Sequence, residues 1–292
     1  MSDNMGKLAR MITLYNEKGG SGKTASVVTI STLLALLNKK VLVIDLDQQG
    51  NTSQKFEVQE IYQPGDIVDF LYNNADFEEI VKHSKYGVDV LRNNARFEQH
   101  EDNPSEYHRL RGYDVDEGLY MLRDKLEPYL TRYDFVLVDT HPENNIWSRM
   151  SLVASKNVLI PVNPDGSSYM GFRKTYMLIE EIRQKYNPDL EILGVLLTRV
   201  KKRVVNHRLS VDKFDDFAGN YMLKSTIRSE QAMEDADSAY MPVYYYSAKT
   251  NSGTDYINAC MEMGLINRDE RDSLRKKYMT SNEPFVMPGY NS

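Results

Sequence analysis

The sequence has one cysteine and one tryptophan among its 292 residues, and it contains no long apolar run. A single cysteine excludes an internal disulfide framework, a C-x-x-C metal site and an iron–sulfur cluster built by one chain alone. No stretch approaches the roughly eighteen apolar residues that a transmembrane helix needs. Residues 1–7 are polar and lack the apolar core of a secretory signal. These absences predict a cytoplasmic protein.

Excess positive charge is also lacking, because the formal net charge is −6 at pH 7. This argues against a protein that coats nucleic acid through a uniformly basic surface, but it leaves a local basic face open. The apolar fraction of 41% and the charged fraction of 27% are ordinary for a globular protein. The length allows one large α/β domain or two small domains.

A glycine-rich segment, residues 16–24, lies between a strand-like run at 8–15 and a helical pattern at 25–37. Glycines in such a turn let consecutive backbone N–H groups point at an anion, and the helix dipole favours negative charge there. Lys23 is placed to reach the β- and γ-phosphates of a nucleotide, and the hydroxyl of Thr24 to bind Mg²⁺. The segment therefore predicts a phosphate-binding loop.

Two apolar runs that end in acids, residues 39–47 and 133–139, have the pattern of strands buried on both faces of a parallel sheet. Ligands of open α/β sheets bind at the carboxyl ends of the strands. Asp45, Asp47 and Asp139 are therefore candidates for the active site, with Asp139 binding Mg²⁺ directly or through a water. The alternative for a strand-end aspartate is a helix N-cap.

Strand and helix signals alternate along the rest of the chain, which predicts a doubly wound, mostly parallel sheet flanked by helices. We expect helices at 67–72, 77–81, 114–130, 169–186, 254–265 and 267–281, and strands at 88–91, 156–162, 191–198 and 242–246. Residues 93–112 are expected to form a surface loop, and residues 229–237 an acidic turn or short helix. We place one domain at 1–265, followed at 266–292 by a charged helix and a disordered tail.

One dense basic cluster, residues 199–203 with His207 and Arg208, stands out against the acidic composition. A charge run of this kind is either a solvated face or a contact for nucleic acid. His141, which follows the second acid-ended strand, could act as a general base, but a single histidine in such a loop is more often incidental. We favour the incidental interpretation.

Three segments together, residues 18–24, 43–51 and 136–140, resemble the ParA/MinD family of deviant Walker-A ATPases. The middle segment is most similar to the ParA branch, although Gln48 stands where that branch has a proline. Residues 158–162 and 187–198 are also similar to ParA segments. The resemblance covers residues 8–265 and is looser over 56–130.

The resemblance implies a dimerising P-loop ATPase that binds ATP and Mg²⁺ and hydrolyses ATP slowly until a partner stimulates it. It implies that Lys18 crosses the dimer interface to the partner's ATP, that Asp47 orients water with support from Asp45, and that Thr24 and Asp139 hold Mg²⁺. The implied nucleotide-binding residues are Lys18, Gly19, Gly20, Ser21, Gly22, Lys23, Thr24, Ala25, Thr198 and Arg199.

The resemblance also implies that the ATP-bound homodimer binds non-specific DNA in plasmid or chromosome partitioning, and that it is associated with the nucleoid. A centromere-binding or cargo adaptor protein would release it. The DNA-binding positions implied are Lys201, Lys202, Arg203 and Arg208. The sequence departs from the family pattern at Ser229 and Ala232, where two more arginines are usual.

Three alternatives remain at this point. A MinD-like membrane ATPase would need a basic amphipathic helix at the extreme C-terminus, and residues 283–290 contain two prolines instead. A cargo-positioning ATPase would use the same nucleotide site. A tyrosine autokinase is suggested by Tyr244–Tyr246, but a strand is expected there. We expect no operator-specific autorepression, because the phosphate-binding loop begins at residue 16, and no membrane partner.

Overall fold

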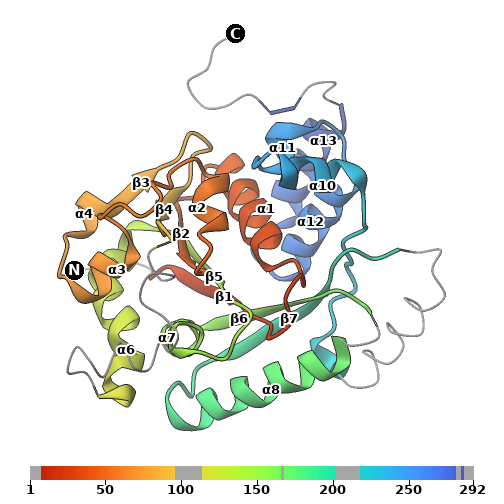
Figure 1. Ribbon diagram of the computed structural model, residues 1–292. Coiled ribbons are helices and arrows are strands. Elements are labelled where there is room, and N and C mark those ends of the chain that lie inside the picture. The colour runs from red at the N-terminus through yellow and green to blue at the C-terminus, as the bar shows by residue number, and fades with distance from the viewer. Residues whose placement is uncertain (1–7, 96–113, 166–167, 202–217, 281–283, 286–292) are drawn as a thin grey trace, which may run out of the picture.

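The computed structural model describes residues 8–95, 114–165, 168–201, 218–280 and 284–285 (Figure 1). Within these residues the chain forms a seven-stranded sheet in the order β3-β4-β2-β5-β1-β6-β7. Neighbouring strands are parallel except for β3 and β4, which are antiparallel. Helices cover both faces of this sheet, so the predicted α/β class with a doubly wound, mostly parallel sheet is confirmed.

The central strands are apolar along their whole length because each packs against helices on both faces. In β2 (Val41–Leu46), Leu42 and Ile44 belong to one buried cluster, and Val41 and Val43 belong to the other. This alternation is the two-residue period of the pleated strand. The remaining strands are β1 (Arg10–Leu14), β3 (Val81–His83), β4 (Asp89–Leu91), β5 (Phe135–Thr140), β6 (Asn157–Val162) and β7 (Glu191–Leu197).

The helices divide between these two clusters, as Figure 1 shows for α1 with α12 on one face and α7 with α8 on the other. They are α1 (Lys23–Leu36), α2 (Asn51–Lys55), α3 (Ile67–Tyr72), α4 (Phe77–Ile80), α6 (Val115–Leu126), α7 (Ile146–Ala154), α8 (Ser168–Lys185), α10 (Gln231–Ser238), α11 (Val243–Tyr246), α12 (Asn251–Glu262) and α13 (Arg268–Thr280). Two 3₁₀ turns, η2 (Glu127–Arg132) and η3 (Gly219–Tyr221), complete the described elements.

The strand predicted at 242–246 is wrong, because this segment is the short helix α11. A short apolar run does not distinguish a buried strand from a buried helix by its pattern alone. Here Tyr244 and Tyr245 are both buried: the Tyr244 hydroxyl donates to the carbonyl of Gly253 in α12 at 2.8 Å, and the ring centroids of Tyr245 and Tyr86 lie 4.9 Å apart. Burial of this kind also argues against a tyrosine autokinase that would use these two residues.

Other differences are local. The helix predicted at 114–130 ends at Leu126 and continues as η2, where Pro128 lacks the N–H that an α-helical hydrogen bond needs. The sequence patterns did not indicate α2, α7 or β3. Helix α7 begins after Asn145, whose side chain accepts a hydrogen bond from the Ser148 backbone N–H at 3.0 Å. Such an N-cap is a signal that the sequence did contain.

The predicted charged helix near the C-terminus is present as α13, and it packs against the body of the protein. Leu274 and Tyr278 belong to the same buried cluster as α1 and α12, and the hydroxyls of Tyr278 and Thr250 lie 2.7 Å apart. The domain boundary at residue 265 stays a prediction. Of the expected loop at 93–112, only residues 93–95 are described. Among the described helices, none combines the length and the apolar character needed to cross a membrane.

Candidate functional site

The glycine-rich loop connects β1 to α1 and lines a cavity of about 530 Å³. Gly20 and Gly22 have φ angles of 71° and 89°, a left-handed conformation that side chains disfavour. Helix α1 begins at Lys23 and carries no acidic residue in its first turn. Its N-terminal N–H groups and dipole therefore face this cavity with no acidic side chain of the helix's own first turn to offset their positive potential, which suits an anion such as phosphate.

Lys23 is a buried cation that lines the cavity beside the glycine-rich loop. The residue is only 6% exposed, and its Nζ donates to the backbone carbonyl of Asn16 at 3.1 Å. Burial lowers the pKa of Lys23, while the nearby charges of Asp139 and Asp47 oppose that shift. Because desolvation disfavours the ammonium, an anion entering the cavity would supply the partner that it lacks.

Asp139 and two threonines form a polar cluster beside α1. The hydroxyls of Thr24 and Thr52 both donate to Oδ2 of Asp139, at 2.8 Å and 2.7 Å. Its other oxygen, Oδ1, is buried without a hydrogen-bond partner in the described part of the chain. An orphaned carboxylate oxygen next to hydroxyl ligands fits Mg²⁺, which prefers oxygen ligands. Thr52 was not predicted, although it directly follows the family-like segment 43–51.

The acidity of this cluster is strongly perturbed. Burial, followed by the charge of Asp47, raises the pKa of Asp139 to about 6. Burial and then the charge of Asp139 raise the pKa of Asp45 well above its usual value. Asp45 and Asp139 are paired in register on adjacent strands, so their carboxylates repel each other in a medium of low dielectric.

The two acids at the end of β2 occupy different places. Asp47 lines the cavity, and its Oδ1 accepts from the Gln49 backbone N–H at 3.1 Å. Asp45 is fully buried and is not part of the cavity lining; it accepts from the hydroxyl and backbone N–H of Ser53 and from the Asp47 N–H. Asp45 therefore fixes the chain that carries Asp47. The catalytic roles of both residues stay predictions.

Lys18 does not line the cavity. Its Nζ forms an ion pair with Asp165 and donates to the hydroxyl of Ser168 at 2.8 Å, so it is held at the start of α8 in its own chain. Gly171 of α8 leaves room for this side chain, because a Cβ there would lie 3.2 Å from the Cβ of Lys18. Lys18 can reach across a dimer interface, as the resemblance predicts, only if its contacts with Asp165 and Ser168 break.

Thr198 and Arg199 follow β7 and border a second cavity of about 180 Å³, between the glycine-rich loop and α10. The Thr198 hydroxyl donates to the carbonyl of Ser21 at 2.7 Å, which ties the end of β7 to the loop. Arg199 lines both cavities. Met233 and Tyr256 give the second cavity apolar walls that the sequence patterns did not indicate.

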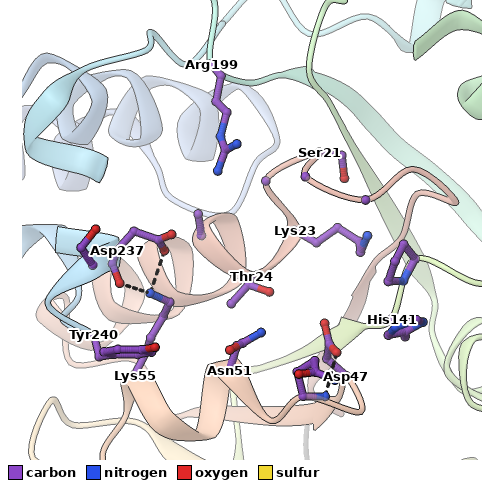
Figure 2. Close-up of a pocket in the computed structure, with 17 residues that line it drawn as sticks. Ser21, Lys23, Thr24, Asp47, Asn51, Lys55, His141, Arg199, Asp237 and Tyr240 are labelled. Carbon is purple, nitrogen blue, oxygen red and sulfur yellow. Dashed lines mark hydrogen bonds and ion pairs between the residues drawn. The ribbon is translucent and has the colours of Figure 1, made fainter. Parts of the chain in front are cut away.

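The larger cavity also contains residues outside the predicted site. Figure 2 shows Asn51 and Lys55 from α2, Asp237 in the last turn of α10, Tyr240 just after that helix, and His141 from the loop after β5. His141, interpreted as incidental from the sequence, is thus a lining residue. Of the predicted DNA-binding residues, Lys201 is exposed just after Arg199. Lys202, Arg203 and Arg208 lie outside the described residues. Ser229, one of the departures from the family pattern, lines the second cavity.

The parallel sheet, the glycine-rich loop at the N-terminus of α1 and the Thr24–Asp139 cluster define a P-loop nucleotide-binding protein. A family model described as an AAA domain matches residues 9–192. The chain therefore belongs to this AAA-domain family, and it is of the ParA type within it, as the resemblance predicted.

Comparison with known proteins supports this assignment. The chain is similar to "Chromosome partitioning protein ParA" of Myxococcus xanthus, with 25% identity over 275 residues that cover 92% of each chain. The ATP complex of a Cyanothece McdA variant has a TM-score of 0.77 at 16% identity, covering 90% of this chain and 99% of that one. The septum site-determining protein MinD of Pyrococcus horikoshii, complexed with Mg-ADP, has a TM-score of 0.69 at 19% identity, with coverage of 89% and 97%.

Proposed function

We propose that this protein is an ATP-hydrolysing switch that binds Mg·ATP in the larger cavity and dimerises in that state to bind DNA during partitioning. The observation that carries the nucleotide part is the convergence of Lys23, Thr24 and Asp47 on one cavity, with Asp139 bound to Thr24 behind it. ATP and Mg²⁺ also agree with the nucleotide and magnesium named for the McdA and MinD structures.

In this proposal each group of the chain has a defined task. The N–H groups of the glycine-rich loop and Lys23 bind the phosphates, and Thr24 and Asp139 hold Mg²⁺, which when bound neutralises charge on the phosphates. Asp47 orients the attacking water, and Asp45 keeps the Asp47 loop in place through Ser53. The buried position of Lys23 strengthens its attraction to phosphate, because the surrounding dielectric is low.

The dimeric part of the proposal concerns Lys18. Phosphoryl transfer needs positive charge at the transferred group, and a cation supplied by a second subunit makes hydrolysis depend on dimerisation. Lys18 lies at the edge of the glycine-rich loop, with its side chain 22% exposed, so it is accessible to a second copy of the chain once its contacts to α8 open. An adaptor protein that favours this arrangement would accelerate hydrolysis.

The DNA part is supported by the name of the Myxococcus xanthus relative and by the basic cluster at 199–203. In a dimer this cluster is present twice, and neutralisation of DNA phosphates adds up across contacts. The alternative output is a membrane surface, which the resemblance to the MinD branch of the family implies. Both alternatives use the same nucleotide site, so only the surface that is bound separates them.

The test is co-sedimentation of the full chain with plasmid DNA or with anionic liposomes, at moderate salt, with ATP, with ADP and without nucleotide. We expect ATP-dependent sedimentation with DNA and none with liposomes. Lys23→Ala should abolish it, and the double variant Lys202→Ala/Arg203→Ala should weaken it while leaving ATP binding intact. Lys276→Ala/Lys277→Ala, on α13, is the matched control for loss of positive charge. ATP-dependent sedimentation with liposomes alone would favour the membrane alternative.

A further inference from the structure

The two cavities meet at a small set of residues. Gly22, Ala25, Arg199, Asp237 and Ser238 line both the 530 Å³ and the 180 Å³ cavity. If the phosphates lie on the glycine-rich loop, the smaller cavity with its Met233 and Tyr256 walls offers a place for the flat base. The ribose, which joins phosphate to base, then lies at the junction between Arg199 and Asp237.

Asp237 at this junction is held from one side by a buried lysine. Lys55 Nζ lies 2.7 Å from Asp237 Oδ1 and donates to the Asp237 backbone carbonyl at 3.0 Å; Figure 2 marks both contacts. The Lys55 side chain is 6% exposed, whereas that of Asp237 is 50% exposed. A lysine so buried needs its charge partner, so one oxygen of Asp237 is committed to it. Among the described residues, the other oxygen has no hydrogen-bond partner.

The backbone around Asp237 is also fixed. Helix α10 ends in a turn in which the Tyr240 N–H bonds to the Asp237 carbonyl at 3.2 Å and the Met241 N–H to the Ala236 carbonyl at 3.0 Å. Tyr240 takes the left-handed conformation of this helix end, with φ 53°, where glycine is preferred. Its ring lies 5.3 Å from Lys55 Nζ, a cation–π contact that offsets part of this strain. Lys55 thus anchors the whole turn.

We infer that Asp237, positioned by Lys55, accepts hydrogen bonds from the ribose hydroxyls and makes the protein selective for ribonucleotides over deoxyribonucleotides. This inference rests on the proposed nucleotide function of the same site. An ionised carboxylate oxygen can only accept hydrogen bonds. The ribose of ATP offers two hydroxyl donors, at the 2′ and 3′ positions, and each deoxy analogue lacks one of them. The anchor matters because a carboxylate on a mobile turn would lose rotational freedom on binding, whereas Asp237 is already in place.

The test measures the equilibrium binding of ATP, 2′-deoxy-ATP and 3′-deoxy-ATP in the presence of Mg²⁺. Binding is measured by calorimetry under conditions in which the nucleotide is not hydrolysed. We expect the wild-type chain to prefer ATP over at least one deoxy analogue by about tenfold, the factor for one hydrogen bond to a charged group. The double variant Lys55→Met/Asp237→Ala, which leaves no buried unpaired charge, should bring this preference close to unity. The double variant should bind ATP about tenfold more weakly than wild type. Its affinity for the deoxy analogue that the wild type disfavours should change less than twofold.

Two further variants separate positioning from folding. Lys55→Arg keeps the charge and should retain most of the preference, whereas Lys55→Met alone should lose part of it. Lys39→Met/Glu270→Ala removes an ion pair remote from the cavity and should leave the preference unchanged. Equal wild-type affinity for all three nucleotides, or an unchanged preference in the double variant, would overturn the inference while leaving the ATP site intact. A wild-type chain that binds none of the three would overturn the nucleotide function itself.

Discussion

Lys18 and Asp165 form an ion pair within one chain, and Ser168 accepts a second bond from the same ammonium. The lysine that the family resemblance assigns to the partner's nucleotide is therefore bound to the start of α8 in the structure described here. One Nζ cannot occupy both places, so the intramolecular contact would compete with the proposed ATP-dependent dimerisation.

This competition predicts the effect of Asp165→Asn. The variant should reach half-maximal ATP-dependent dimerisation at a lower protein concentration, by about two- to fivefold, because a half-exposed ion pair is worth up to about 1 kcal/mol. Analytical ultracentrifugation with ATP measures this shift. Glu180→Gln, which removes an ion pair with Arg183 on the same helix, is the control and should behave as wild type. Weaker dimerisation of Asp165→Asn would mean that Asp165 supports the dimer.

Lys23→Met should separate binding from stability. The folded-state pKa of Lys23 lies below its ordinary value, so the charged lysine lowers the free energy of unfolding at neutral pH. This destabilisation is relieved only as pH rises through the folded-state pKa. We expect the nucleotide-free variant to be more stable by about 1 kcal/mol, as is common when a strained functional residue is removed. Its affinity for ATP should fall more than about 100-fold. Chemical denaturation and calorimetry check the two effects, and unchanged ATP affinity would refute the phosphate role.

Asp139→Asn should change the pH dependence of stability. With its pKa raised to about 6, the folded wild-type protein binds a proton that the unfolded chain releases near pH 4, so stability falls as pH rises across this window. The asparagine variant has no carboxyl group to titrate at this position. Its free energy of unfolding should exceed that of wild type by on the order of 2 kcal/mol above pH 6.5, and this difference should shrink below pH 5. Denaturation without Mg²⁺ at several pH values tests it, and a gain that does not vary with pH would contradict the assignment.

Thr198→Val should loosen the glycine-rich loop. The Thr198 hydroxyl donates to the Ser21 carbonyl at 2.7 Å in a buried setting, and valine keeps the shape without the donor. We expect a loss of about 1–2 kcal/mol in the free energy of unfolding and weaker ATP binding, because the Ser21 carbonyl loses its partner. Thr198→Ser should retain both. Equal ATP affinity in the three proteins would show that this contact does not shape the loop.

Much of the nucleotide site could be predicted from the sequence because its parts are local. A glycine-rich turn before a helix, or an apolar strand that ends in an acid, has its chemistry within a few neighbouring residues. The same local signals identified most helices and strands. They were wrong for residues 242–246, where packing of Tyr244 against α12 and of Tyr245 against Tyr86 selected a helix over a strand.

The sequence by itself determined that Lys23, Thr24 and the acids at the ends of β2 and β5 would meet, because parallel strands bring their carboxyl ends to one edge of the sheet. Only the tertiary structure decided which groups complete that edge. Thr52 bonds to Asp139 across 87 positions, Lys18 to Asp165 across 147, and Lys55 to Asp237 across 182. Such pairs depend on how separate helices pack over the sheet, and no local period in the chain encodes that packing.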